Sequence, residues 1–254
     1  MARRRDEGFV LARFPYRERD LVVAVLSRES GLVRLVARRV RGARSALTSA
    51  LESLAHVQLS YFERAGSELA TLDEVVLKRS SFSLARDPTA WTAGQVLAEL
   101  ALAFCPPAQR VEPLFRLFDR CLQALLAGLP PQLVVDYASL WFLRLTGILP
   151  EVDRCGICGA ALAAGERVFD TAGGTFVCQD HPSVQGRLRL SAAAHAWLAA
   201  ALREPVERLE GGAPADAGEW LEHLRRDFTD RELASLRVLR RLQAEAGGRG
   251  RPPG

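Results

Sequence analysis

Residues 8–45 read GFVLARFPYRERDLVVAVLSRESGLVRLVARRVRGARS, and this stretch decides the fold of the N-terminal part of the chain. It contains apolar-rich runs at 8–14, 20–28 and 32–40, each about as long as a β-strand. The sequence Glu29-Ser30-Gly31 separates the second run from the third, as a hairpin turn does. The stretch therefore predicts three consecutive strands.

Two further strands are predicted immediately downstream. The runs at 54–62 and 68–77 flank the turn-forming sequence Arg64-Ala65-Gly66-Ser67. Five short strands so close together favour a small antiparallel barrel. The Ala/Leu-rich segment 45–53, between the third and fourth strands, predicts a short helix. A five-stranded barrel with such a helix is an OB-type barrel.

The chain becomes helical from about residue 81. Apolar residues at helical spacing predict helices in the segments 90–104, 111–127, 132–146, 191–203 and 217–242, the last of which can form one helix or two. Ser191 is a suitable N-cap for the fourth of these helices. A hairpin is predicted at 166–178.

Four metal-binding side chains occur at zinc-ribbon spacing between the helical segments. Cys155-Gly-Ile-Cys158-Gly forms a C-x2-C knuckle, and 19 intervening residues later Cys178 and His181 form a C-x2-H pair. Two knuckles can place four ligands tetrahedrally around one Zn²⁺, and four protein ligands are typical of structural rather than catalytic zinc. A redox C-x2-C motif or unconnected buried thiols are the alternatives, although the βαβ context of a thioredoxin-like motif is absent. His181 is the ligand most in need of a test.

These patterns predict an α+β multi-domain protein, with an N-terminal OB-fold β-barrel and a C-terminal α-helical bundle into which a zinc-ribbon-like finger is inserted. The expected segments are an OB-fold at 1–79, a bundle made of 80–152 and 185–246, a zinc finger at 153–184 and a disordered tail at 247–254.

The composition is that of a globular protein with a mildly basic balance. Of the 254 residues, 48% are hydrophobic and 25% are charged, and the net charge is +4. The sequence has no run of about 18 apolar residues and no apolar signal-peptide core, so we expect a cytoplasmic protein. Five cysteines in such a chain favour thiols or metal ligands over disulfides. Cys105 and Cys121, in or beside apolar helical runs, are expected to be buried.

Positive charge is concentrated at the N-terminal end of the chain. The first 49 residues contain 12 arginines and 5 acidic residues, a net charge of +7 against +4 for the whole chain. We expect the predicted barrel to bind nucleic-acid phosphates through the arginines of its third strand and of the loop and turns nearby. These are Arg34, Arg38, Arg39, Arg41 and Arg44, helped by Arg13, Arg17 and Arg19. The alternative is a solvated, charged strand and loop without a ligand.

Aromatic side chains suitable for stacking on bases are few in this region. They are Phe9, Phe14, Tyr16, Tyr61 and Phe62. Because strand alternation is expected to bury several of them, the sequence favours contacts to the nucleic-acid backbone over base stacking.

The sequence offers little support for catalysis. It contains no HExxH, G-x-S-x-G, P-loop or dinucleotide-binding motif. Glu18 and Asp20 lie among arginines, where solvated ion pairs explain them, and His56, His195 and His223 are isolated in the sequence. We therefore expect no catalytic residues and a protein that is not an enzyme.

The stretch 8–45, with its Tyr16-Arg-Glu18-Arg-Asp20 segment, resembles the start of the bacterial recombination mediator family RecO, and LTGILPEVDRCGICGA followed by FDTAGGTFVC is similar to the C-terminal part of that family. The resemblance implies an OB-fold, a helical bundle and an inserted zinc finger. It implies binding of single- and double-stranded DNA, annealing of complementary strands and association with the nucleoid. The implied partners are RecR, the C-terminal tail of single-stranded-DNA-binding protein and, indirectly, RecA. In zinc-bearing members a fourth cysteine is usual, and His181 takes that place here.

Two other classes of function remain open at this stage. The apolar region 90–146 could serve an adaptor whose helices chiefly recruit protein partners, although the same pattern is typical of a core. A zinc hydrolase would need an open coordination position, which the four-ligand spacing does not favour.

Overall fold

The computed structural model describes residues 2–40, 46–63, 66–107, 109–162, 165–182, 186–230 and 232–249. The chain divides into two compact units, one comprising residues 1–128 and 233–254 and the other residues 129–232. The boundaries between these units fall inside the two segments, 80–152 and 185–246, that the sequence assigned to one helical bundle, and the expected segment boundaries stay predictions. Among the described residues, no helix has both the length and the apolar character needed to cross a membrane.

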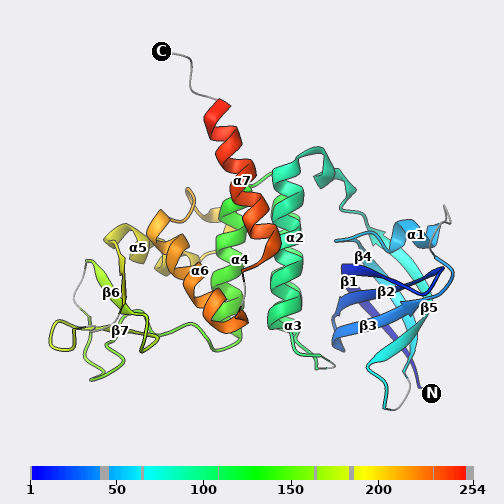
Figure 1. The fold of residues 1–254 in the computed structure, drawn as a ribbon, viewed down its shortest axis with the longest axis horizontal. Helices are drawn as coiled ribbons and strands as arrows, with labels where there is room; N and C mark the ends of the chain where they lie inside the picture. The colour runs from blue at the N-terminus through cyan, green and yellow to red at the C-terminus, as the bar shows by residue number, and fades with distance from the viewer. Residues whose placement is uncertain are drawn as a thin grey trace. The chain divides into compact units, whose positions relative to one another are not determined.

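The N-terminal strands of the first unit close into a five-stranded barrel (Figure 1). The strands are β1 (Ala2–Tyr16), β2 (Asp20–Ser27), β3 (Gly31–Ala37), β4 (His56–Glu63) and β5 (Leu69–Arg79). They run in the order β1-β2-β3-β5-β4, and neighbours are antiparallel except for the parallel pair β3 and β5. Helix α1 (Ala46–Ala50) lies between β3 and β4 in the chain. The predicted OB-type barrel is confirmed.

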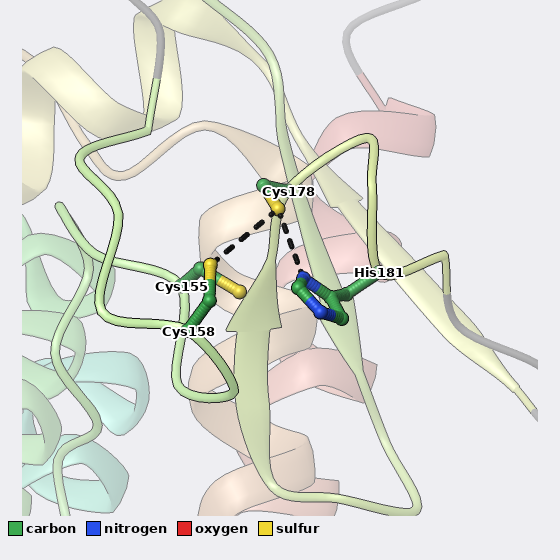
Figure 2. Close-up of side chains that lie close together, drawn as sticks. All are labelled: Cys155, Cys158, Cys178 and His181. Atoms are coloured by element: carbon green, nitrogen blue, oxygen red, sulfur yellow. Dashed lines mark hydrogen bonds between the residues drawn. The ribbon is translucent and has the colours of Figure 1, made fainter.

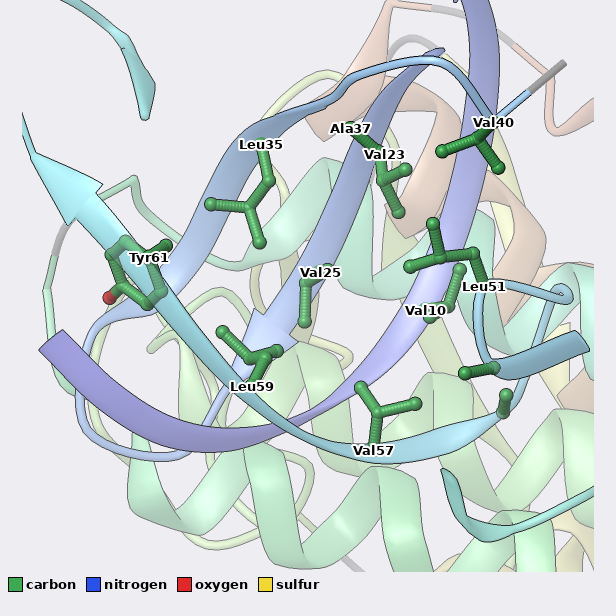
Figure 3. Close-up of a cluster of buried hydrophobic side chains, with 12 residues drawn as sticks. Val10, Val23, Val25, Leu35, Ala37, Val40, Leu51, Val57, Leu59 and Tyr61 are labelled. Atoms are coloured by element: carbon green, nitrogen blue, oxygen red, sulfur yellow. The ribbon is translucent and has the colours of Figure 1, made fainter. Parts of the chain in front are cut away.

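Alternating apolar side chains fill the barrel (Figure 3). Val10, Val25, Leu35 and Tyr61, from four different strands, are each at most 1% exposed. The Tyr61 hydroxyl donates a hydrogen bond to Ser30 Oγ at 2.8 Å, so the buried phenol keeps a polar partner. The period-two pattern read from the sequence thus forms the core of this unit.

A β-bulge in β1 changes which of its side chains face that core. The register between β1 and β2 shifts between Val10 and Ala12. After the shift, Arg13 pairs with the core residue Val23, and Phe14 therefore lies on the outer face. An unbroken alternation starting at Val10 would have placed Arg13 outside and Phe14 inside.

Three α-helices and a short 3-10 helix complete the first unit. They are α2 (Pro88–Phe104), α3 (Glu112–Leu126), α7 (Ala234–Arg249) and η1 (Phe82–Arg86). The α2 helix begins at a proline preceded by Asp87, whose carboxylate accepts a hydrogen bond from the Thr89 N–H at 2.8 Å. Helix α7 continues to Arg249, three residues into the segment expected to be a tail, and residues 250–254 lie outside the described part.

Helices α2 and α3 contact the outer face of the barrel at β1, and α7 packs against α2. Phe9 of β1 contacts Phe115 and Phe118 of α3, with ring centroids 5.1 and 5.0 Å apart. Helix α7 is joined to α2 by Ser235, whose backbone N–H donates to the Glu99 carboxylate at 3.2 Å. The buried faces of α2 and α3 therefore serve as core, which is the reading that the sequence left open for the region 90–146.

The second unit combines helices with a small sheet. Its elements are α4 (Pro131–Leu145), β6 (Arg167–Asp170), β7 (Thr175–Val177), β8 (Arg187–Leu190), α5 (Ala192–Ala201), η2 (Val206–Arg208) and α6 (Ala215–Thr229). The predicted hairpin is formed by β6 and β7, and β8, which the sequence did not predict, pairs with the other edge of β6. Ser191 caps α5 as predicted, because its Oγ accepts the Ala194 N–H at 3.1 Å.

The sheet of the second unit packs against α6 through aromatic side chains. Phe169 and Phe176 are fully buried with Trp220, and their ring centroids lie 5.9 and 5.3 Å from that of Trp220. Buried Arg225 on α6 donates a hydrogen bond to Ser139 Oγ of α4. The predicted helical segment 217–242 is therefore two helices, α6 and α7, which belong to different units.

Candidate functional site

The structure brings the four predicted metal ligands of the second unit together (Figure 2). Cys155, Cys158, Cys178 and His181 each offer a ligand atom, and these atoms all lie within 4.8 Å of one another. Cys158 Sγ is 3.9 Å from Cys178 Sγ, and Cys178 Sγ is 3.3 Å from His181 Nδ1. Sulfurs bound tetrahedrally to zinc at about 2.3 Å lie roughly 3.8 Å apart, so this group can hold one metal ion.

Backbone geometry shapes the first knuckle. Gly159 has φ +71°, and its N–H donates to the Cys155 carbonyl at 2.8 Å, which closes the tight turn. The Gly156 N–H donates to the Phe176 carbonyl at 2.9 Å, and this bond attaches the knuckle to β7. Because Cys178 directly follows β7, the same contact sets the distance between the two halves of the metal group.

The electrostatics of the cluster favour a thiolate at Cys155. The backbone N–H of Cys158, followed by other nearby N–H groups that outweigh burial, lowers the pKa of Cys155 to about 6. At Cys158 the Ala160 N–H lowers the pKa, but burial and the neighbouring thiols of Cys155 and Cys178 outweigh it, so that pKa is raised. Stabilisation of one thiolate beside other sulfur donors is what a soft metal cation requires.

A polar contact outside the ligand group fixes the chain that enters the knuckle. Asp153 Oδ1 is 2.8 Å from His195 Nε2 on α5, and it is 3.5 Å from Nη2 of the buried Arg167. Hydrogen bonding to His195 is the main cause that lowers the pKa of Asp153. His195, which is isolated in the sequence, therefore anchors the segment at Asp153 that leads into the knuckle.

The remaining cysteines are buried, as the sequence predicted. Cys105 and Cys121 are at most 5% exposed in the first unit. Burial raises the pKa of Cys105 to about 12, so that thiol stays protonated.

The predicted phosphate-binding arginines gather in part at one end of the barrel. Arg17 and Arg19 lie in the turn between β1 and β2, and Arg38 and Arg39 directly follow β3. The Asp20 carboxylate accepts the Arg39 N–H at 2.9 Å, which joins the two turns. All four side chains are exposed, and the two turns that carry them are named the arginine turns. Arg41 and Arg44 lie outside the described residues.

The other two candidate arginines, Arg34 and Arg13, lie on different faces of the barrel. Arg34 lies exposed on the outer face of β3, opposite the core residue Leu35. Arg13 shares the inner face with Val23 and donates from both terminal nitrogens to the Glu52 carboxylate, at 3.2 and 3.3 Å. The bulge and this ion pair place Arg13 apart from the arginine turns.

Other N-terminal arginines, which a count of charges treats like the candidates, form ion pairs with acidic residues. Arg3 pairs with Asp73, Arg4 with Glu63 and Arg28 with Glu7. These contacts cross between strands, so the sequence carried no local signal for them. Strand alternation was expected to bury several aromatic side chains, and Phe9 and Tyr61 are buried, whereas Phe14 is 52% exposed.

Comparison with protein families agrees with this architecture. The model of the family described as "Recombination protein O N terminal" matches residues 1–81, and "Recombination protein O C terminal" matches residues 85–237. The chain belongs to the RecO family. The N-terminal RecO match contains the barrel, and the C-terminal RecO match contains the metal group.

Individual RecO proteins match along nearly the whole chain. A protein named "DNA repair protein RecO" from Anaeromyxobacter dehalogenans (strain 2CP-1 / ATCC BAA-258) is 34% identical over 249 residues, which cover 94% of this chain and 96% of the relative. The protein of the same name from Koribacter versatilis (strain Ellin345) is 29% identical over 246 residues, covering 94% and 99%. That from Thermobifida fusca (strain YX) is 32% identical over 222 residues, covering 85% and 88%.

Proposed function

We propose that this RecO-family chain is a non-enzymatic DNA-binding protein that mediates recombination in DNA repair. It binds single- and double-stranded DNA, anneals complementary strands and helps load recombinase at gaps and breaks. The relatives' printed name, DNA repair protein RecO, supports the biological role. The observation that carries the binding proposal is the exposed set of arginine turns on the barrel.

The chemistry of the arginine turns suits the phosphate backbone. Arg19, Arg38 and Arg39 are exposed and have no ion pair among the described residues, unlike Arg13. Guanidinium groups bind phosphate through paired N–H donors, and neutralising phosphates releases condensed counterions. A basic surface that holds two strands also reduces their mutual repulsion, which favours annealing.

The binding proposal is tested by reversing charge at the arginine turns. We expect R38E/R39E to reduce binding to labelled single and double strands strongly, in fluorescence anisotropy at fixed salt. The matched control is R116E/R241E, which makes the same change of net charge at two exposed helical positions of the same unit. Equal losses in both variants would show a general charge effect and would reject this surface as the DNA site.

We further propose that the metal group binds zinc and is structural. Three thiolates and one imidazole are a common zinc donor set, and four protein ligands leave no open position for a catalytic water. Zinc would hold the knuckle against β7 and would take no part in a reaction. Elemental analysis of protein purified under reducing, chelator-free conditions should find about one zinc per chain. Metal-free, fully folded protein would contradict the proposal.

The partners and location proposed for this chain follow the family resemblance. They are RecR, the C-terminal tail of single-stranded-DNA-binding protein and, indirectly, RecA, in the cytoplasm with the nucleoid. Copurification of tagged protein with purified RecR, and with a peptide of that tail, tests the first two directly. Absence of both interactions at micromolar concentrations would leave DNA binding as the remaining part of the proposal.

A further inference from the structure

Phe14 is a large apolar side chain that the barrel leaves in solvent. Its side chain is 52% exposed on the outer face of β1. Phe14 pairs with Val22 of β2, and Val22 pairs with Val36 of β3, so the three side chains form a row across three strands. Both valines are half-buried, which leaves the phenylalanine ring as the accessible part of the row.

Two arginines flank the β3 end of this apolar row, one on each side of Val36. Arg34 lies on the outer face of β3 two residues before Val36, about 7 Å along the strand. Arg38 lies two residues beyond Val36, directly after β3. Positive charge beside an exposed ring is complementary to a single nucleic-acid strand, because its phosphates follow the backbone and its bases project from the sugars.

The other aromatic rings on the outer face of the barrel are buried or half-buried, and half-buried Phe62 has the Arg3 guanidinium 6.0 Å from its ring centroid. Phe9 contacts the rings of α3. Tyr16, two residues after Phe14, is half-buried and lies under the Arg17 guanidinium, 5.3 Å from its ring centroid. Phe14 is therefore the open ring among the described aromatic residues of this face.

We propose that Phe14 is a stacking platform for an unpaired base of a single DNA strand whose phosphates contact Arg34 and Arg38. This rests on the proposed DNA-binding function and replaces the backbone-only contact expected from the sequence. Every base has a π-face, so the platform accepts any sequence. In a duplex the bases are already stacked and paired, so Phe14 contributes to single-strand binding and not to duplex binding.

The test uses the full-length protein and the substitution Phe14→Ala. Removing one stacking ring should weaken binding to a single-stranded oligonucleotide by about 5- to 150-fold. Affinity for a duplex of the same length should change by less than about 2-fold, because the arginines still bind its phosphates. An oligonucleotide with abasic sites should bind wild type and Phe14→Ala equally.

A matched control is available in the same unit. Phe82 is 74% exposed on η1, so Phe82→Ala removes the same ring from another surface position. It should leave both affinities unchanged. Phe14→Trp should keep single-strand affinity and report stacking by quenching of the added tryptophan fluorescence, and circular dichroism checks that each variant is folded.

The outcomes separate this inference from the function on which it rests. If wild type binds neither single strands nor duplex, the proposed DNA-binding function fails. If wild type binds both and Phe14→Ala binds single strands as tightly, the stacking platform is rejected and the DNA-binding function stands. Equal losses on single strands and duplex would also reject it, since stacking cannot act on paired bases.

Discussion

Gly156 lies so close to Thr175 that a Cβ atom on the glycine would be 1.9 Å from Thr175 Oγ1. The glycine is inside the first metal knuckle, and the threonine begins β7, which leads to the second. A close approach that only glycine permits therefore holds the two halves of the metal group in contact. This relationship makes the site sensitive to one methyl group.

Gly156→Ala is expected to destabilise the second unit and to lower its metal content. Real Cβ atoms do not approach to 1.9 Å, so the knuckle or β7 must shift and separate the ligands. Differential scanning fluorimetry and elemental analysis measure both effects. Gly218→Ala is the control, because Gly218 lies in α6 with open space around it and alanine favours helix. Unchanged metal content in Gly156→Ala would contradict the close-packing argument.

Cys155→Ser should lower thermal stability far more than it lowers DNA affinity. Structural zinc sites contribute about 10–16 kcal/mol of apparent binding energy in zinc-finger peptides, so losing a ligand weakens local folding. The predicted DNA contacts belong to the other unit of the chain. A strong chelator should lower the melting temperature of wild type and leave that of Cys155→Ser unchanged. Identical melting of the two proteins without chelator would argue against a structural metal.

Arg38→Ala and Arg13→Ala should differ in their effect on DNA binding, although the sequence grouped them together. Removing Arg38 should flatten the slope of log K against log salt on single strands by about 0.7, the value for one phosphate contact. Arg13 is held by Glu52, so Arg13→Ala should leave the slope unchanged. It should alter stability by about 0–1 kcal/mol, as exposed ion pairs do. Equal slopes in the two variants would show that the ion pair does not decide which arginine binds.

His56 should make the first unit less stable in mild acid. Burial, followed by the charge of Arg79, lowers the pKa of His56 below its ordinary 6.5. The unfolded chain then binds a proton more readily than the folded chain, so stability is complete above pH 6.5 and falls as the pH drops through and below that value. Urea unfolding at pH 7.5 and pH 5.5 should show this loss, and His56→Gln should reduce it. The same pH dependence in both proteins would assign the effect to other groups.

The metal group shows which features of a site the local spacing of residues can predict. The two C-x2 motifs lie on short turns, so their spacing alone predicted which four residues come together, His181 included. The hairpin between them was also predictable from its turn sequence. The third strand, β8, was not, because it pairs with β6 only after the chain has returned from beyond His181. Its four residues, Arg187–Leu190, alternate as a strand does, but so short a run does not indicate which strand it pairs with.

For the barrel, the sequence by itself indicated five strands, although not the charged residues 2–7 at the start of β1. It also indicated the turn at Gly31 and the excess of arginine, because alternation, glycine and charge are local properties. Only the tertiary structure decided which arginines face solvent without an acidic partner and which aromatic ring stays exposed. The physical reason is the bulge between Val10 and Ala12. One extra residue in a strand of period two reverses every side chain after it, which turned Arg13 towards Glu52 and Phe14 towards solvent.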